Sequence, residues 1–373
     1  MKSKQDIPDW KQQGLFTFVL FPTSKSVKQA MLQDFGYDDV KFMQIIRDIR
    51  KRILKIGQVA DLGYEAILLQ GSGANAVEAV ISTGTPPDGK WLVIQNGELG
   101  ARVAKIVDVL KIRKTVLDYP GNSLPDVGEI FKTLKEDPLI THVAIVHNEM
   151  TTGLINPIKE IGEIVKRFKK IYFVDAESSY GAVPMNLEEL KIDWLASTAD
   201  LSIEGVSGIA FAVVKKDVLL AAEENSRSYT LDLFDQWKGF EKYGQFRFPP
   251  PAHAILAFNQ ALIELEKEGG VFAREARYKK NYQTLVEGMH SMGFTELLAP
   301  ELQVHSVVSF RYPEHPNFNL DKFYKKMKNR GYAISQGTAD KAHYFRLAFG
   351  GRIYESDVLE LLKAIKETME MSI

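Results

Sequence analysis

The sequence predicts an α/β protein with a mainly parallel sheet that is covered by helices on both faces. Short apolar runs typical of buried strands alternate along the chain with stretches whose apolar residues recur at helical spacing. Such alternation indicates βαβ units, in which buried strands are linked by crossover helices. With 373 residues, of which 45% are hydrophobic and 25% charged, the chain has an ordinary globular composition and can bury a large core.

The elements of the first part of the chain are predicted from these two patterns. The predicted strands are apolar runs too short for a helix: 66–69, 91–94, 142–146, 171–174 and 194–197. The helices predicted between them include 76–81, 101–110 and 157–168.

The pattern of predicted elements changes after the three prolines at 249–251. The elements predicted there are long helices at 253–267 and 273–288, an edge-type strand at 304–312 and a C-terminal helix at 357–369 capped by Ser356. We therefore expect a large α/β domain over residues 15–250 and a smaller α+β domain over residues 251–373.

Charge, cysteine content and hydropathy exclude several classes of protein. Lys and Arg number 47 against 48 Asp and Glu, a formal net charge of −1, which disfavours a nucleic-acid-binding protein. Cysteine is absent, so disulfides, thiolate zinc sites and cysteine nucleophiles are excluded, and we predict no metal site. The N-terminus lacks a signal-like apolar run, and no apolar stretch is long enough to span a membrane. We expect a cytoplasmic protein with neither nucleic-acid nor membrane partners.

The segment from Gln70 to Ala76 follows a predicted strand and opens a predicted helix. Glycines let the backbone approach an anion, and the free N–H groups at a helix start favour negative charge. The hydroxyl of Ser72 adds a further donor. A phosphate cradle and a tight turn that requires small residues explain this segment about equally well.

Three further segments place polar side chains where a ligand would bind. Asp175 ends a predicted strand, where its carboxylate would pair with a protonated ring nitrogen or cap a turn. His147, Glu149 and Thr151 follow another predicted strand, although a histidine there is more often structural than catalytic. Arg346 lies in an apolar, strand-like run, where it would bind a ligand carboxylate or form an internal salt bridge.

Taken in order, several segments resemble the 2-aminoethylphosphonate–pyruvate aminotransferases, a class V group of fold-type I pyridoxal phosphate (PLP) enzymes. These segments include TSKSVKQAM from Thr23, LLQGSGANAVEAV from Leu68, NGELGAR from Asn96, HNEMTTGLINPI from His147 and VDAESSYGAVPM from Val174. The resemblance runs from about residue 20 to the C-terminus. It implies the fold-type I architecture, PLP as the family's cofactor, a homodimer, and a small anionic ligand, either a carboxylate or a phosphonate.

The resemblance also implies roles for single residues. Those that match the family's cofactor-binding positions are Ser72, Gly73 and Ala74 at the phosphate, Asp175 at the ring nitrogen, Glu149 and Thr151 near the ring oxygen, and Ser197 before the lysine segment. Arg346 matches the arginine that binds the carboxylate of the amino acceptor.

The lysine segment departs from the family's pattern. That pattern reads roughly S-A-N-K-C-I-Q-G-V-P-G, whereas residues 198–208 read TADLSIEGVSG, so Leu201 stands at the position of the Schiff-base lysine. A leucine has no nitrogen with which to form a Schiff base or move a proton. Leu99 and Asn75 replace family aromatics, and Pro249 replaces a phosphate-binding threonine expected from the partner subunit. These changes concern the same cofactor.

Three functions therefore remain open. The first is a pseudoenzyme that has lost Schiff-base transaminase chemistry and binds a small anion or serves as a partner protein. The second is an active aminotransferase that moves an amino group from an aminoalkylphosphonate-like donor to pyruvate with non-covalently bound PLP. The third is a lysine-independent reaction in which His147, Glu149 and Glu177 supply acid–base groups. Lys215 and Lys216 follow a predicted strand and are expected to be solvated turn residues.

Overall fold

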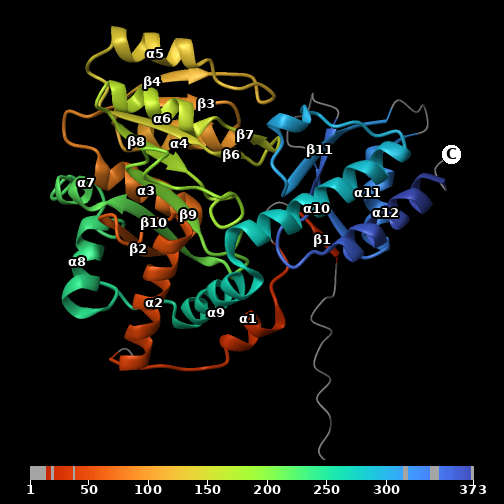
Figure 1. The fold of residues 1–373 in the computed structure, drawn as a ribbon, viewed down its shortest axis with the longest axis horizontal. Coiled ribbons are helices and arrows are strands. Elements are labelled where there is room, and N and C mark those ends of the chain that lie inside the picture. The colour runs from red at the N-terminus through yellow and green to blue at the C-terminus, as the bar shows by residue number, and fades with distance from the viewer. Residues whose placement is uncertain (1–13, 18–20, 37, 314–317, 337–343, 371–373) are drawn as a thin grey trace, which may run out of the picture.

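A computed structural model describes residues 14–17, 21–36, 38–313, 318–336 and 344–370, which form a large body and a smaller one (Figure 1). The large body is built on a seven-stranded sheet in the order β2-β10-β9-β8-β5-β3-β4. Its strands are β2 (Tyr64–Gly71), β3 (Lys90–Gln95), β4 (Arg113–Asp118), β5 (His142–Val146), β8 (Ile171–Asp175), β9 (Trp194–Thr198) and β10 (Gly208–Lys215).

The strand directions confirm the mainly parallel sheet. Only β10 among these strands runs antiparallel to its neighbours, which are β2 and β9. Every residue of β5 and β9 is buried, as expected for strands covered on both faces. The helices of the large body are α1 (Lys25–Ala30), α2 (Val40–Ile56), α3 (Gly73–Gly84), α4 (Glu98–Val109), α5 (Val127–Glu136), α6 (Ile158–Arg167), α7 (Lys216–Leu220), α8 (Leu233–Tyr243) and α9 (Ala252–Glu268).

Local sequence explains where several of these helices begin and end. Asp39, Asp126 and Asp232 precede α2, α5 and α8, and each carboxylate accepts a hydrogen bond from a backbone N–H of the first turn. Gly244 and Gly269 end α8 and α9 in the left-handed conformation, which glycine adopts without steric cost.

The smaller body has a four-stranded sheet in the order β1-β12-β13-β11. Its elements are β1 (Gly14–Phe16), β11 (Val307–Arg311), β12 (Tyr332–Gln336), β13 (Tyr344–Ala348), α10 (Gly270–Ser291), the 3-10 turn η1 (Pro300–Leu302), α11 (Leu320–Asn329) and α12 (Glu355–Glu370). The edge position predicted for the strand near residue 307 is confirmed. The expected cap is wrong, because α12 already begins at Glu355 and Ser356 lies within its first turn.

The two bodies have separate cores that do not divide at residue 250. Ile255, Phe258 and Leu262 of α9 are buried in the core of the large sheet. Phe16 of β1 instead belongs to the core of the smaller body, because β1 pairs with β12. We propose a domain boundary at 269–270, between α9 and α10, in place of the expected division into 15–250 and 251–373.

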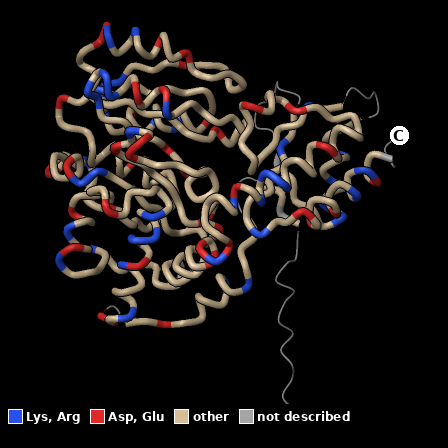
Figure 2. The backbone as a smooth tube through the Cα atoms, in the orientation of Figure 1, with Lys and Arg blue, Asp and Glu red and all other residues tan. Residues whose placement is uncertain are grey.

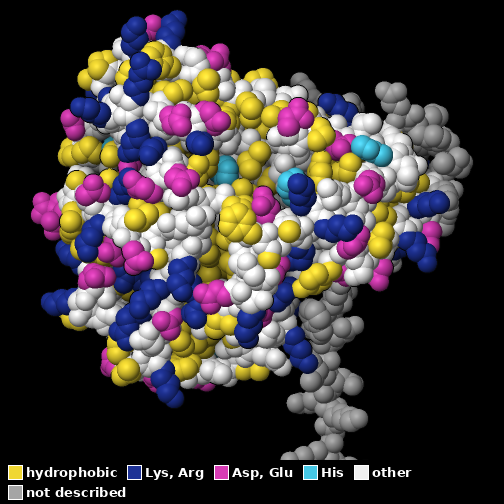
Figure 3. Space-filling model, in the orientation of Figure 1, with side chains coloured by type: hydrophobic (Ala, Val, Ile, Leu, Met, Phe, Trp, Pro, Cys, Tyr) yellow, Lys and Arg dark blue, Asp and Glu magenta, His cyan; other side chains and the backbone are white. Residues whose placement is uncertain are grey.

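Charged side chains of both signs are interspersed over the two bodies (Figure 2). The face shown in Figure 3 likewise carries basic, acidic and apolar side chains. No helix among the described residues is long and apolar enough to cross a membrane.

Candidate functional site

The candidate residues follow the carboxyl ends of strands that run in the same direction through the large sheet. Ser72 follows β2, His147 follows β5, Asp175 ends β8 and Leu201 lies shortly after β9. Carboxyl ends of parallel strands meet at one edge of the sheet, where open α/β folds bind ligands. The short hairpin of β6 (Asn148–Glu149) and β7 (Leu154–Ile155) holds the segment after β5 at this edge.

Asp175 is buried and already paired with a cation of its own chain. One carboxylate oxygen accepts a hydrogen bond from Nη2 of Arg102 on α4 at 3.0 Å, and the other accepts one from the backbone N–H of Glu177 at 3.0 Å. The same Arg102 nitrogen lies 2.6 Å from Oε2 of Glu177. Burial lowers the pKa of Arg102, but the charges of Asp175 and Glu177 outweigh burial and raise that pKa overall. The guanidinium thus stays charged between two carboxylates.

The glycine turn opens α3 as predicted, but the two donors of Ser72 are engaged within the chain. The backbone N–H and the hydroxyl of Ser72 both donate to the side-chain oxygen of Asn75, at 2.9 and 3.0 Å. Ala74 lies in the first turn of α3. A Cβ on Gly73 would lie 2.2 Å from the carboxylate carbon of Glu177, so that carboxylate rests directly against the turn.

Glu149 lies at the N-terminus of α4 and is buried. Its carboxylate accepts hydrogen bonds from the Thr151 hydroxyl at 2.8 Å and from the backbone N–H groups of Leu99 and Gly100 at 3.1 and 3.4 Å. Burial raises the pKa of Glu149, and these hydrogen bonds oppose the rise. Glu149 therefore caps α4, a position where negative charge is stabilising.

His147 is buried and pairs with the hydroxyl of Ser179, at 2.9 Å from Nδ1. Burial lowers its pKa to about 4, so the imidazole is neutral at pH 7. Ser197 is also buried and donates its hydroxyl to the carbonyl of Ala176 at 3.2 Å. Both side chains have structural partners within the large body.

Leu201 lies in a third apolar cluster that joins the two bodies, with only 6% of its surface exposed. The other buried members of this cluster are Phe21, Met150, Val304, Val307 and Ala348. Leu99, which replaces a family aromatic, packs against the same cluster. The position expected to carry an amine is therefore surrounded by apolar side chains.

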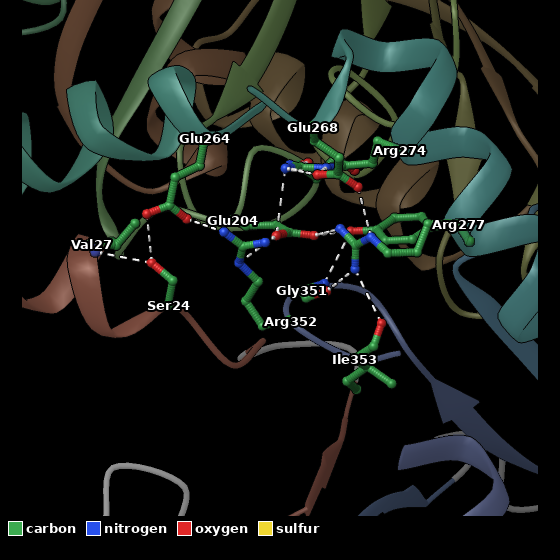
Figure 4. A network of polar contacts seen from close by, with 12 residues as sticks. Ser24, Val27, Glu204, Glu264, Glu268, Arg274, Arg277, Gly351, Arg352 and Ile353 are labelled. Carbon is green, nitrogen blue, oxygen red and sulfur yellow. Dashed lines mark hydrogen bonds and ion pairs between the residues drawn. The ribbon is translucent and has the colours of Figure 1, made fainter. Parts of the chain in front are cut away.

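The loop after Leu201 is held by a network of charged side chains (Figure 4). Oε1 of Glu204 lies 2.5 Å from Nη2 of Arg277, and Oε2 lies 3.5 Å from Nη2 of Arg274. Arg274 also donates to the carbonyl of Ser202 at 2.7 Å. Both arginines lie on α10 and share Glu268 as a second partner.

The same network extends to the segment between β13 and α12 of the smaller body. Arg277 donates to the backbone carbonyls of Gly351 and Ile353, at 2.6 and 3.1 Å, and Arg352 pairs with Glu264 of α9. We did not predict this network. One signal was available, since Glu204 stands where the family pattern has an uncharged glutamine.

Arg346 lies in β13 and is completely buried. Its Nη1 lies 3.4 and 3.3 Å from the backbone carbonyls of Met150 and Thr151, which belong to the segment after β5. Burial lowers the pKa of Arg346, although neighbouring charges oppose that shift. The sequence-predicted Arg346 and Thr151 are thus brought together across the two bodies.

Lys215 and Lys216 lie far from Leu201. They end β10 and begin α7, opposite Tyr64, whereas Gly208 at the other end of β10 pairs with Gly71 beside the glycine turn. Lys215 lies 2.9 Å from Glu188, and Lys216 lies 3.3 Å from Glu65. Neither lysine replaces the missing amine.

Comparison with known proteins identifies the family. The Aminotransferase class-V profile matches residues 33–348. A 2-aminoethylphosphonate–pyruvate transaminase from Syntrophobacter fumaroxidans is 42% identical over 348 residues, which cover 93% of this chain and 94% of that protein. The chain belongs to the class V aminotransferase family. The transaminase of the same name from Klebsiella pneumoniae is also 42% identical to this class V protein, over 93% of this chain and 95% of its own length.

Solved structures confirm the fold of this class V protein. Alanine–glyoxylate aminotransferase from Nostoc sp. superposes with a TM-score of 0.88 at 20% identity, covering 96% of this chain and 95% of that one. Pyridoxamine–pyruvate aminotransferase from Mesorhizobium loti gives 0.86 at 20% identity, over 96% and 93% of the two chains. The architecture is that of fold-type I PLP-dependent aminotransferases.

PLP is the family's cofactor, but the described residues of this chain do not fit it. Both carboxylate oxygens of Asp175 already have partners within the chain, the guanidinium of Arg102 and the backbone N–H of Glu177. The carboxylate of Glu177 rests against the glycine turn, where it would repel a phosphate. Leu201 offers no amine within its apolar cluster.

Proposed function

We propose that this class V protein does not carry out Schiff-base transamination and acts as a non-catalytic protein that binds a small anion or a partner. The observation that carries this proposal is the burial of Leu201 in the apolar cluster that joins the two bodies. Schiff-base chemistry requires an amine that attacks a carbonyl and then moves a proton. An aliphatic side chain in a dry cluster supplies neither group.

The alternative to this proposal is the reaction after which the relatives are named. Their names describe amino transfer between 2-aminoethylphosphonate and pyruvate. The third possibility, acid–base catalysis without lysine, finds little support, because His147, Glu149 and Glu177 each have partners within the chain.

The purified protein should be mixed with PLP, reduced with borohydride and analysed by peptide mass spectrometry. We expect no reduced adduct at the candidate site, and no alanine from 2-aminoethylphosphonate plus pyruvate. Alanine formation above the rate of a protein-free control would overturn the proposal.

A lysine introduced at the site provides a companion measurement. The change Leu201→Lys places an amine in the apolar cluster, whereas Leu220→Lys places one on the exposed surface of α7. Because the cofactor contacts are also remodelled, we expect neither variant to form alanine. Activity restored by Leu201→Lys alone would contradict the remodelling and support loss of the lysine as the sole defect.

We also propose that the small anion, a carboxylate or a phosphonate, binds at Arg346. The guanidinium is buried beside the carbonyls of Met150 and Thr151, so an anion reaches it only when that segment moves. Calorimetric titration with pyruvate and with 2-aminoethylphosphonate tests this site. We expect Arg346→Gln to weaken binding at least tenfold and Arg346→Lys to weaken it less, whereas equal affinities in all three proteins would exclude the site.

We propose that the protein is a homodimer. Support comes from aromatic side chains exposed around α8: Tyr229 is 77% exposed, Tyr243 63% and Phe248 38%. The guanidinium of Arg247 lies 5.2 Å from the ring of Tyr229 and 5.3 Å from that of Phe248. Aromatic residues and arginine are enriched at interfaces. Light scattering should give the mass of a dimer, and Tyr229→Asp should shift it toward the monomer; a monomeric wild-type protein would refute this arrangement.

A further inference from the structure

The turn at the start of α3 has the features of an anion cradle. It joins β2 to a helix of 12 residues, with Gly71 at the end of the strand and Gly73 at the start of the helix. The start of such a helix carries partial positive charge and unpaired N–H groups. A backbone with this arrangement attracts a phosphate or a carboxylate.

An anion is already present there, and it belongs to the chain. The carboxylate of Glu177 lies so close to Gly73 that a Cβ would meet its Cδ at 2.2 Å and its Oε1 at 2.4 Å. The side chain of Glu177 is only 17% exposed. The space beside the turn that glycine leaves open is therefore filled by a negatively charged group.

Arg102 fixes this carboxylate in place. Its guanidinium joins Glu177 at 2.6 Å to the fully buried carboxylate of Asp175 at 3.0 Å. The backbone N–H of Glu177 donates to Asp175 at the same time, so the glutamate is held at both its main chain and its side chain. Two carboxylates at the sheet edge and one guanidinium from α4 thus form a linked group with a formal charge of −1.

We propose that Glu177 is a built-in anion that closes this site to phosphate esters, and that Arg102 positions it. This inference rests on the proposed function, since an active aminotransferase would need this turn open to the phosphate of its cofactor. A tethered carboxylate has an effective concentration in the millimolar range or above, so a free phosphate ester competes with it poorly. It also repels a second anion at close range.

Binding of PLP and of pyridoxal to the unmodified chain and to Glu177→Ala tests this inference. Equilibrium dialysis measures both ligands, and pyridoxal serves as the probe without phosphate. We expect Glu177→Ala to bind PLP at least tenfold more tightly than the unmodified chain, with pyridoxal affinity unchanged. Glu136→Ala, at an exposed position on α5, should leave both affinities unchanged. Equal PLP affinities in all three proteins, or an equal gain for pyridoxal, would overturn the inference.

A second measurement separates charge from volume and remains informative if one variant folds poorly. Glu177→Gln keeps the size of the side chain and removes its charge, so its gain in PLP affinity should be smaller than that of Glu177→Ala but above threefold. A Cβ introduced by Gly73→Ala would displace the carboxylate. Its stability cost should therefore be smaller in the Glu177→Ala background; equal costs in both backgrounds would contradict the contact.

These readouts are independent of the test of the proposed function. They measure reversible binding and stability, and neither requires a lysine or turnover. An adduct or alanine formation in the unmodified chain would overturn the proposed function alone. An unchanged PLP affinity in the Glu177 variants, without any adduct, would overturn this inference alone.

Discussion

Glu204 is the residue whose removal tests most directly how the loop after Leu201 is held. Its side chain is 4% exposed, and it faces Arg274 and Arg277, whose side chains are 0% and 12% exposed. Glu204→Gln keeps the shape and removes the charge. Removing one partner of a buried ion pair costs about 3–5 kcal/mol. We expect about 3 kcal/mol, the lower end, because Glu268 still pairs with both arginines.

Urea unfolding followed by tryptophan fluorescence measures this loss as a lower transition midpoint. The matched control is Glu266→Gln, since Glu266 is 48% exposed and lies 3.2 Å from Arg52. An exposed pair contributes about 0–1 kcal/mol and is screened by salt, whereas a buried pair is screened far less. The loss in Glu204→Gln should therefore persist at about 0.5 M salt. Equal losses in the two variants would refute the network as a support of the loop.

Two further predictions concern burial. Lowering the pH from 7 to 5 should reduce the unfolding free energy by about 2 kcal/mol for each of His142 and His147, because burial lowers their pKa to about 4. The unfolded chain then binds more protons than the folded one, so this contribution to the unfolding free energy is present above about pH 6.5 and lost below it. Unfolding curves at pH 7 and pH 5 measure the loss. The variant His147→Gln should remove about half of the difference between the two pH values. Leu201→Ala should cost about 3 kcal/mol by opening a cavity, whereas Leu359→Ala, at a site 54% exposed, should cost under about 1 kcal/mol; similar losses in denaturant titrations would argue against the buried cluster.

Much of the fold could be predicted because its signals are local. The strand expected at 142–146 has those bounds in the structure, and the helix expected at 253–267 is α9, at 252–268. Apolar periodicity and strand length suffice for such elements. The expected cap of the last helix failed because the helix begins at residue 355, two residues before the expected start at 357, and helix ends depend on contacts as well as on sequence.

The partners of the candidate site residues could not be predicted. Asp175 was expected to pair with a ring nitrogen or to cap a turn; the structure also pairs it with Arg102, which is 73 positions away in the chain. Glu204 and Arg277 are likewise separated by 73 positions. Such groups come within hydrogen-bonding distance only when the chain folds, so composition and spacing do not predict which of them pair.

Sequence by itself determined the alternating architecture and the identity of residue 201. Both follow from side-chain chemistry along the chain: periodic apolar residues specify strands and helices, and a leucine has no amine. Tertiary structure alone decided that Leu201 is enclosed by apolar side chains from both bodies and that Glu177 lies against the glycine turn. Burial and ion pairing depend on distances between segments remote in sequence, and those distances exist only once the sheet and the two cores have formed.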